Sequence, residues 1–165
     1  MKIIIDACSV ILLGKITILE AFLRNKDTMI TRGVYEEVIA GKEKKLFDAL
    51  LLERLASENK INISDDFDKN IFVKLSEDFG LGKGEAETIS YAIKNKQSII
   101  ITDNKQGRKA AKIYGLSLSG SIEVIVSLYK SNKIDKNKAL NSILNLKKFG
   151  WFNDDIINKA MEDIK

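Results

Sequence analysis

The chain contains no histidine, no proline and a single cysteine, Cys8, among its 165 residues. Without histidine, the usual general base, serine–histidine nucleophile pairs and histidine-containing zinc sites are excluded. One cysteine excludes an intramolecular disulfide and a zinc site built from thiolates. The absence of proline beside 30% charged residues is typical of a helix-rich chain without proline-rich linkers.

Long apolar runs are also missing. No apolar stretch is long enough to span a bilayer, and no signal-peptide pattern precedes the run from Ile3 to Ile5. The length fits one domain, residues 1–165, which can bury a core without disulfides or a structural metal. We therefore expect a soluble, cytoplasmic, single-domain protein with no membrane partner.

Positive charge is concentrated in one part of the chain. The formal net charge is +4, but residues 94–148 alone hold 12 basic and 3 acidic side chains. Solvated helix faces explain such a segment in most proteins. The alternative is a surface that binds the phosphates of a nucleic acid.

Hydrophobic periodicity alternates between short apolar runs and helical spacing. The pattern predicts strands at 2–5, 28–31, 61–63, 98–102 and 116–118. It predicts helices at 11–24, 34–40, 44–56, 66–79, 85–96, 105–114, 121–131, 136–148 and 154–164, with Asp65 or Asp66 capping the fourth. Strands separated by helices indicate an α/β fold, a central parallel sheet flanked by helices on both faces.

Acidic residues follow the two most apolar strands. Asp6 ends "KIIID", and Asp103 follows "SIIIT". In a parallel sheet the carboxyl ends of the strands form the functional crevice, so both acids reach it if these strands are neighbours. Taken singly, each is more simply a helix N-cap. A buried Asp6 also requires a compensating partner.

Two further stretches carry acids at the start of expected helices. In "LGKGEAETISYA", Glu85 and Glu87 suit a helix N-terminus, and the glycines match neither a dinucleotide fingerprint nor a Walker motif. In "VYEEV", helical spacing allows one of Glu36 and Glu37 to face the sheet edge while the other faces solvent.

These segments, taken in order, resemble the PIN-domain ribonucleases, in particular small prokaryotic members related to VapC toxins. The resemblance rests on "DACSVILLGKI", "VYEEV", "LGKGEAETISYA", "IITDNKQGRKAA" and "YGLSLSGSIEVIVSLYKSNKI", and covers nearly the whole chain. It implies a three-layer PIN-like fold and a metal-dependent endoribonuclease. It also implies a small antitoxin partner and a homodimer.

The resemblance places the family's acidic cluster on Asp6, Glu37, Glu85 and the "TDN" of residues 102–104. The expected catalytic acids are thus Asp6, Glu37, Glu85 and Asp103, and the expected metal ligands are Asp6, Glu85, Asp103 and Asn104. The family usually has a carboxylate where Asn104 stands, so either Asp103 or Asn104 is the ligand. Glu123 is a weaker candidate for a compensating acid, more simply explained as a solvent-facing helix residue.

Crowded carboxylates raise each other's pKa, and a divalent cation removes that cost. Oxygen ligands alone favour Mg²⁺ or Mn²⁺ over zinc, and one or two such ions suffice for phosphodiester hydrolysis. By this reasoning the partner of Asp6 is a metal ion.

Basic residues directly follow the "TDN" stretch. Arg108, Lys109 and Lys112 are expected on one helix as nucleic-acid contacts, with Arg108 and Lys112 on a shared face. Tyr114 and Trp151 are more simply core or interface aromatics than base-stacking residues.

The sequence therefore favours a metal-dependent endoribonuclease. The alternative is a PIN-like module that binds nucleic acid or protein and has lost catalysis through Asn104. The sequence does not decide between RNA and DNA, or which RNA is cleaved. A phosphoacceptor domain is disfavoured because the expected threonine and lysine partners are missing.

Overall fold

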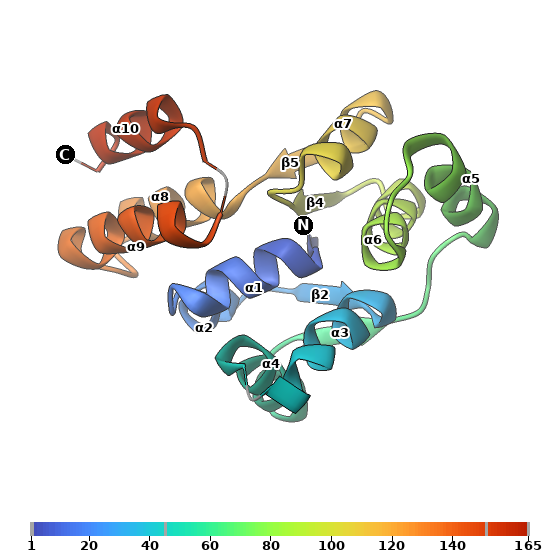
Figure 1. Ribbon diagram of the computed structural model, residues 1–165, viewed down its shortest axis with the longest axis horizontal. Coiled ribbons are helices and arrows are strands. Elements are labelled where there is room, and N and C mark those ends of the chain that lie inside the picture. The colour runs from blue at the N-terminus through green and yellow to red at the C-terminus, as the bar shows by residue number, and fades with distance from the viewer. Residues whose placement is uncertain (1, 45, 151, 165) are drawn as a thin grey trace.

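The computed structural model describes residues 2–44, 46–150 and 152–164 (Figure 1). Its strands are β1 (Lys2–Ile5), β2 (Thr28–Thr31), β3 (Asn62–Ser64), β4 (Ser98–Ile101) and β5 (Ser117–Ser119). Its helices are α1 (Ala7–Lys15), α2 (Leu19–Leu23), α3 (Arg32–Ile39), the 3-10 helix η1 (Ala40–Lys44), α4 (Phe47–Ser57), α5 (Lys69–Phe79), α6 (Lys83–Lys94), α7 (Lys105–Ile113), α8 (Ser121–Lys130), α9 (Lys136–Phe149) and α10 (Asp154–Glu162).

The strands form one parallel sheet in the order β3-β2-β1-β4-β5. The chain builds outward from β1 through β2 and β3, then returns to add β4 and β5 on the other side of β1. The β1–β4 register pairs Ile5 with Ile101, so Asp6 and Thr102 leave the sheet side by side. The predicted parallel sheet is thereby confirmed, and the condition that β1 and β4 are neighbours is met. Ligand sites in such sheets lie where the strand order reverses, here between β1 and β4.

Alternate strand residues divide the apolar core between the two faces of the sheet. Ile5, Ile30 and Ile101 pack with α1–α4 and α8–α10, whereas Ile4, Met29 and Ile100 pack with α5–α7. This alternation is the period-two pattern of a strand buried on both faces. The α/β fold with helices on both faces is confirmed. In Figure 1, α8, α9 and α10 lie together at one end of the view, with α5 and α6 at the other.

Most element boundaries differ from those expected by a few residues, and three differences are larger or concern a cap. The region predicted as one helix at 11–24 forms α1 and α2, because Thr17 adopts a left-handed φ of 58° between them. The helix predicted at 44–56 begins at Phe47, after the 3-10 turn η1. The N-cap of α5 is Asp68 rather than Asp65 or Asp66, since its Oδ1 accepts hydrogen bonds from the amides of Asn70 and Ile71 at 2.9 and 3.0 Å.

Within the described residues, each helix is too short or too polar to cross a lipid bilayer.

Candidate active site

Five helices begin around the carboxyl edge of the sheet. They are α1, α3, α6, α7 and α8, and polar side chains at this edge accept hydrogen bonds from the first amides of each. Helix N-termini carry partial positive charge and unpaired amide hydrogens, so they stabilise acidic side chains placed there. Among the described residues, the carboxylates at this edge are therefore stabilised by helix N-termini rather than by salt bridges.

Asp6 lies at the centre of this edge and is 2% exposed. It is the N-cap of α1, where its Oδ1 accepts a hydrogen bond from the Ser9 amide at 2.8 Å. Its Oδ2 accepts a hydrogen bond from the Thr102 hydroxyl. Burial raises the pKa of Asp6 to about 6, partly offset by the bonds from Thr102 and Ser9. The predicted partner was a metal ion; the partners that the structure shows are the Thr102 hydroxyl and the α1 N-terminus.

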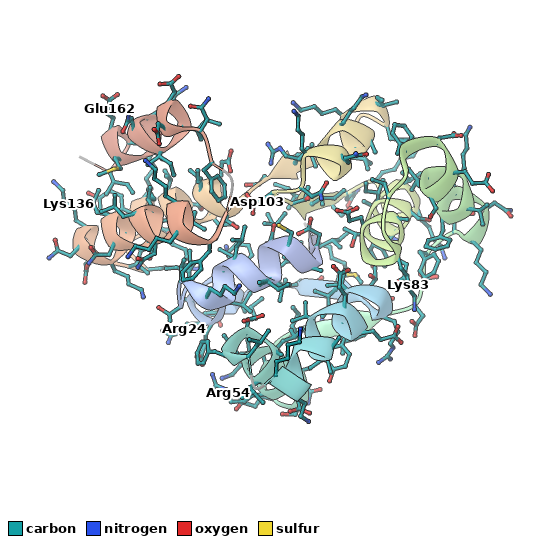
Figure 2. The ribbon with its side chains drawn as sticks, in the orientation of Figure 1. Arg24, Arg54, Lys83, Asp103, Lys136 and Glu162 are labelled. Carbon is teal, nitrogen blue, oxygen red and sulfur yellow. The ribbon has the colours of Figure 1, made fainter. Side chains whose placement is uncertain are left out.

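Asp103 connects α1 to α8. Its Oδ2 accepts hydrogen bonds from Ser9 Oγ at 2.9 Å and Ser121 Oγ at 2.5 Å. The Ser121 amide, in the first turn of α8, donates to Oδ1 at 3.0 Å and to Oδ2 at 3.2 Å. Figure 2 shows Asp103 near the middle of the view. Asp103 is therefore both a cap for α8 and a neighbour of Asp6, whose pKa it helps to raise.

Asn104 has a different role from its neighbour. Its Oδ1 caps α7, accepting hydrogen bonds from the amides of Gln106 and Gly107 at 2.8 and 2.9 Å. The oxygen that would ligate a cation is thus directed at a helix N-terminus. Of the two side chains, that of Asp103 is hydrogen-bonded to Ser9, which also binds Asp6, whereas the Asn104 side chain binds the amides of α7.

Glu37 and Glu85 meet on the α6 side of the edge. Partial desolvation and the charge of Glu85 raise the pKa of the Glu37 carboxyl. Gly84 permits this approach, because a Cβ there would lie 3.0 Å from Glu37 Oε2. Glu85 itself accepts a hydrogen bond from the Gly82 amide at 3.2 Å, closing the first turn of α6. Glu36 instead pairs with Lys83 at 2.6 Å on the surface, so only one acid of this pair faces the edge, as predicted.

The Cys8 thiol lies among these carboxylates. Burial raises its pKa to about 12, with further contributions from the charges of Asp6, Asp103, Glu85 and Glu37 in that order. The charges of all four acids predicted to be catalytic thus act on one side chain. These acids lie at the same edge of the sheet, but within the described residues they do not surround one point.

A second group of side chains converges on Gly120, the N-cap of α8. A Cβ at Gly120 would lie 2.8 Å from Asp103 Oδ1, 2.9 Å from Glu123 Oε2 and 3.2 Å from Arg108 Nη1. Glu123 is therefore next to the acidic cluster. Asp103, Arg108, Glu123 and Phe152 help to line a cavity of about 190 Å³ at this point.

The basic residues of α7 divide into two groups. Arg108 Nη1 donates hydrogen bonds to the carbonyls of Thr102 at 2.8 Å and Ser119 at 3.3 Å, and so holds the ends of β4 and β5 together beside Asp103. Lys109 and Lys112 are exposed on the same helix. Across the described part of the chain, neither forms an ion pair.

Of the two aromatic residues considered for base stacking, Tyr114 packs against Phe79 with ring centroids 6.4 Å apart. It is a partly buried member of the core on the α5–α7 side, which is the simpler of its two interpretations. Trp151 lies outside the described residues.

The donor set is chemically suited to a hard divalent cation. It consists of carboxylate oxygens, and no lysine or arginine in the described ranges forms an ion pair with Asp6, Glu37, Glu85 or Asp103. In their described positions, however, no three acid or thiol groups surround one point closely enough to hold an ion.

Comparison with known proteins decides the family. A family model described as PIN domain matches residues 2–165. The chain belongs to the PIN-domain family. PIN domains are in general nucleases, that is, hydrolases, and PIN nucleases generally use divalent metal ions. No curated protein and no solved structure matches the chain.

Several polar residues of this PIN domain site are not evident from its sequence. Ser9 and Ser121 bind Asp103, and buried Glu87 accepts a hydrogen bond from the Gly33 amide at the start of α3 at 2.7 Å. The spacing of Ser9 three residues after Asp6 is a signal for a capped helix. Ser121 and Glu87 carry no such local signal, because each binds a partner far away in the chain.

Proposed function

We propose that this PIN domain is a Mg²⁺- or Mn²⁺-dependent endoribonuclease. The observation that carries the proposal is the placement of four acids, Asp6, Glu37, Glu85 and Asp103, at the sheet edge where the strand order reverses. Asp6, Glu85 and Asp103 would hold the cation. Its chemistry when bound is that of a Lewis acid, which activates water and offsets charge on the scissile phosphate.

The residues of the chain would prepare the site in separate ways. Thr102 and the α1 N-terminus orient Asp6, and Ser9 and Ser121 orient Asp103. Glu37, whose pKa is raised by desolvation and Glu85, is placed to take up a proton near the cluster. Because Asn104 Oδ1 caps α7, we assign the ligand role to Asp103.

The surroundings of the site suit a single nucleic-acid strand. The cavity beside Asp103 continues into a groove of about 770 Å³ between α8 and α10, and Ile122, Glu123 and Ile156 line both. Lys130 and Lys159 line this groove beside the acids Glu123 and Asp163. Lys109 and Lys112 are exposed positive charges on α7. Such contacts would position phosphates without reading sequence.

The biological role that we propose is that of the toxin in a type II toxin–antitoxin pair, acting in the cytoplasm as one domain and as a homodimer. A small antitoxin protein would hold it inactive. The support is the VapC-like order of motifs in the sequence. A short neighbouring reading frame for a DNA-binding protein that copurifies with this chain and suppresses cleavage would support this role, and light scattering would measure the oligomeric state.

Cleavage of matched single-stranded RNA and DNA with and without Mn²⁺ tests the enzymatic proposal. We expect Asp6→Asn and Glu85→Gln to abolish Mn²⁺-dependent cleavage of RNA while circular dichroism stays unchanged. Glu36→Gln is the matched control, since Glu36 is an adjacent acid paired with Lys83 on the surface. If both site variants cleave at the parent rate, the assigned site is wrong.

A specific observation also favours a second function, binding without catalysis. Asn104 supplies no charge, and the acids of the described chain do not close around one point. In that case the parent protein binds RNA but does not cleave it at any Mn²⁺ concentration. Cleavage by the parent protein excludes this second function.

A further inference from the structure

A buried hydroxyl group beside the acids has no partner. Among the described residues, two buried side-chain oxygens lack a hydrogen bond, Thr28 Oγ1 and Thr88 Oγ1. Thr88 lies in α6, one turn after Glu85, and is 1% exposed. Leaving a buried hydroxyl unpaired costs the free energy of its desolvation, and native structures usually avoid that cost. We therefore expect a hydrogen-bond partner of the Thr88 hydroxyl in the space beside it.

The space next to Thr88 has the size of one water molecule. Thr88 lines a small cavity together with Asp6, Glu85 and Thr102, and Ile89, Ile100 and Gly107 complete its wall. The centre of a water molecule can occupy a volume of about 10 Å³ inside this cavity. A volume of roughly that size holds one water, provided that two to four polar groups surround it.

The polar groups on the wall complement a water molecule. Thr102 Oγ1 already donates to Asp6 and accepts a hydrogen bond from the Asn104 amide at 3.2 Å. Asp6 retains acceptor capacity, because each carboxylate oxygen can accept two hydrogen bonds. Thr88 Oγ1 can donate one hydrogen bond and accept others. A water can thus donate to Asp6 and bond with Thr88 at the same time.

We propose that this cavity is a binding site for one water molecule, which bridges the Thr88 hydroxyl to the Asp6 carboxylate. Thr88 is then a positioning residue. It acts on Asp6 from α6, as Thr102 does from the end of β4, and fixes the carboxylate in the orientation used for the cation. This last consequence rests on the proposed function, whereas the water site does not.

A crystal structure of the parent protein at high resolution tests the site directly. We expect one ordered water within hydrogen-bond distance of both Thr88 Oγ1 and an Asp6 carboxylate oxygen. A dry cavity overturns the proposal. So does a Thr88 hydroxyl turned onto a carbonyl of its own helix, or a cation bound directly to Thr88.

The positioning role is tested by Thr88→Val, which removes the hydroxyl and keeps the shape. Thr28→Val is the matched control, because Thr28 is also 1% exposed with an unpaired hydroxyl, but lies at the start of β2. We expect Thr88→Val to weaken Mn²⁺ binding in calorimetry by about tenfold, as for other residues that orient metal ligands. Thr28→Val should match the parent, and Thr88→Ser should restore the affinity.

The outcomes separate this inference from the proposed function. Equal Mn²⁺ affinity of Thr88→Val and the parent overturns the positioning role, and so does an equal loss in Thr28→Val. A parent protein that neither binds Mn²⁺ nor cleaves RNA overturns the proposed function and, with it, the positioning role. The crystal structure then still decides whether the water site exists.

Discussion

Thr102 donates a hydrogen bond from its hydroxyl to Asp6 Oδ2 across the junction of β1 and β4. The two residues are 96 positions apart in the chain and become neighbours because Ile5 and Ile101 are paired in the sheet. This bond joins the first strand to the fourth at the point where the strand order reverses. The carboxylate at the centre of the site is therefore held by the sheet register itself.

Burial of Asp6 predicts a pH-dependent stability. The folded carboxyl has a pKa of about 6, against an ordinary value of 3.8, so the folded protein binds more protons than the unfolded chain between these values. The free energy of unfolding should fall as pH rises from 4 to 6. Asp6→Asn should remove this slope and raise the free energy of unfolding at pH 8 by up to about 3 kcal/mol.

Urea unfolding of the metal-free protein from pH 4 to pH 8 measures this effect. Asp68→Asn is a suitable control, because Asp68 caps α5 in the same manner outside the acidic cluster. It should retain the slope of the parent. An unchanged slope in Asp6→Asn would show that the carboxyl titrates normally.

Replacing Asp103 by Asn and replacing Asn104 by Asp are predicted to have different effects on stability and Mn²⁺ affinity. Asp103→Asn places an amide NH₂ group near the Ser121 amide, so it should lower the free energy of unfolding by about 1–2 kcal/mol and weaken Mn²⁺ binding. Asn104→Asp keeps the α7 cap and should change Mn²⁺ affinity little. Calorimetry and thermal unfolding measure both quantities. Tighter Mn²⁺ binding by Asn104→Asp, with no loss in Asp103→Asn, would assign the ligand role to residue 104.

Lys112 is predicted to contact phosphate without supporting the fold. Lys112→Ala should weaken RNA binding equally for different sequences and reduce the slope of log affinity against log salt by about 1. Its thermal stability should match the parent, because Lys112 is exposed. Lys136→Ala removes the same charge at the start of α9, away from Asp103 in Figure 2, and should leave the slope unchanged. Equal slopes in all three proteins would make Lys112 an ordinary solvated residue.

Arg108 is predicted to serve both binding and stability. Arg108→Ala should lower RNA affinity like Lys112→Ala, and should also lower the melting temperature, because the Thr102 carbonyl loses the Arg108 donor and the Ser119 carbonyl keeps only the Thr102 amide. Filter binding and thermal unfolding distinguish the two effects. A variant that loses affinity but not stability would show that these two bonds contribute little.

Cleavage is predicted to require glycine at position 120, because there is no room for a side chain there. Its φ of −137° and ψ of −178° are extended, so alanine fits the backbone, but a Cβ would press on Asp103, Glu123 and Arg108. Gly120→Ala should reduce Mn²⁺-dependent cleavage at least tenfold, which corresponds to about 1.4 kcal/mol. Gly82→Ala is the control, since Gly82 also precedes a helix and its Cβ would meet only Glu85 Oε2 at 3.9 Å. Similar rates for both variants would contradict this role.

The sequence was sufficient to predict the layers and the strand ends that carry acids. Apolar runs such as Lys2–Ile5 and Ser98–Ile101 are local signals, and parallel pairing brings their following residues together. The break at Thr17 was not predicted, because apolar helical spacing continues through it. The partners of Asp6 and Asp103 were also missed. Thr102, Ser9 and Ser121 bind them through contacts that depend on strand order and on where α8 begins.

An acid at this edge can bind the first amides of a helix and also lie near the other acids. Asp6 caps the helix that follows it, as the simpler interpretation predicted. Asp103 does not, because Asn104 caps α7 while Asp103 accepts a hydrogen bond from the Ser121 amide of α8. Both aspartates also lie at one edge of the sheet with Glu37 and Glu85. A sequence pattern cannot separate these roles, since a cap and a ligand use the same carboxylate. The structure shows which neighbour each oxygen faces, and that distinction assigns Asp103 and Asn104 to different helices.

The separation of Asp6 from Thr102 along the chain also bears on how the protein is made. Asp6 obtains its hydroxyl donor only after β4 has added to β1, and Asp103 obtains its α8 partner only after Ser121 is in place. A growing chain on the ribosome therefore has no complete site until most of the sequence has emerged. We expect the same delay in refolding, where nuclease activity should return with the last folding phase rather than with early helix formation.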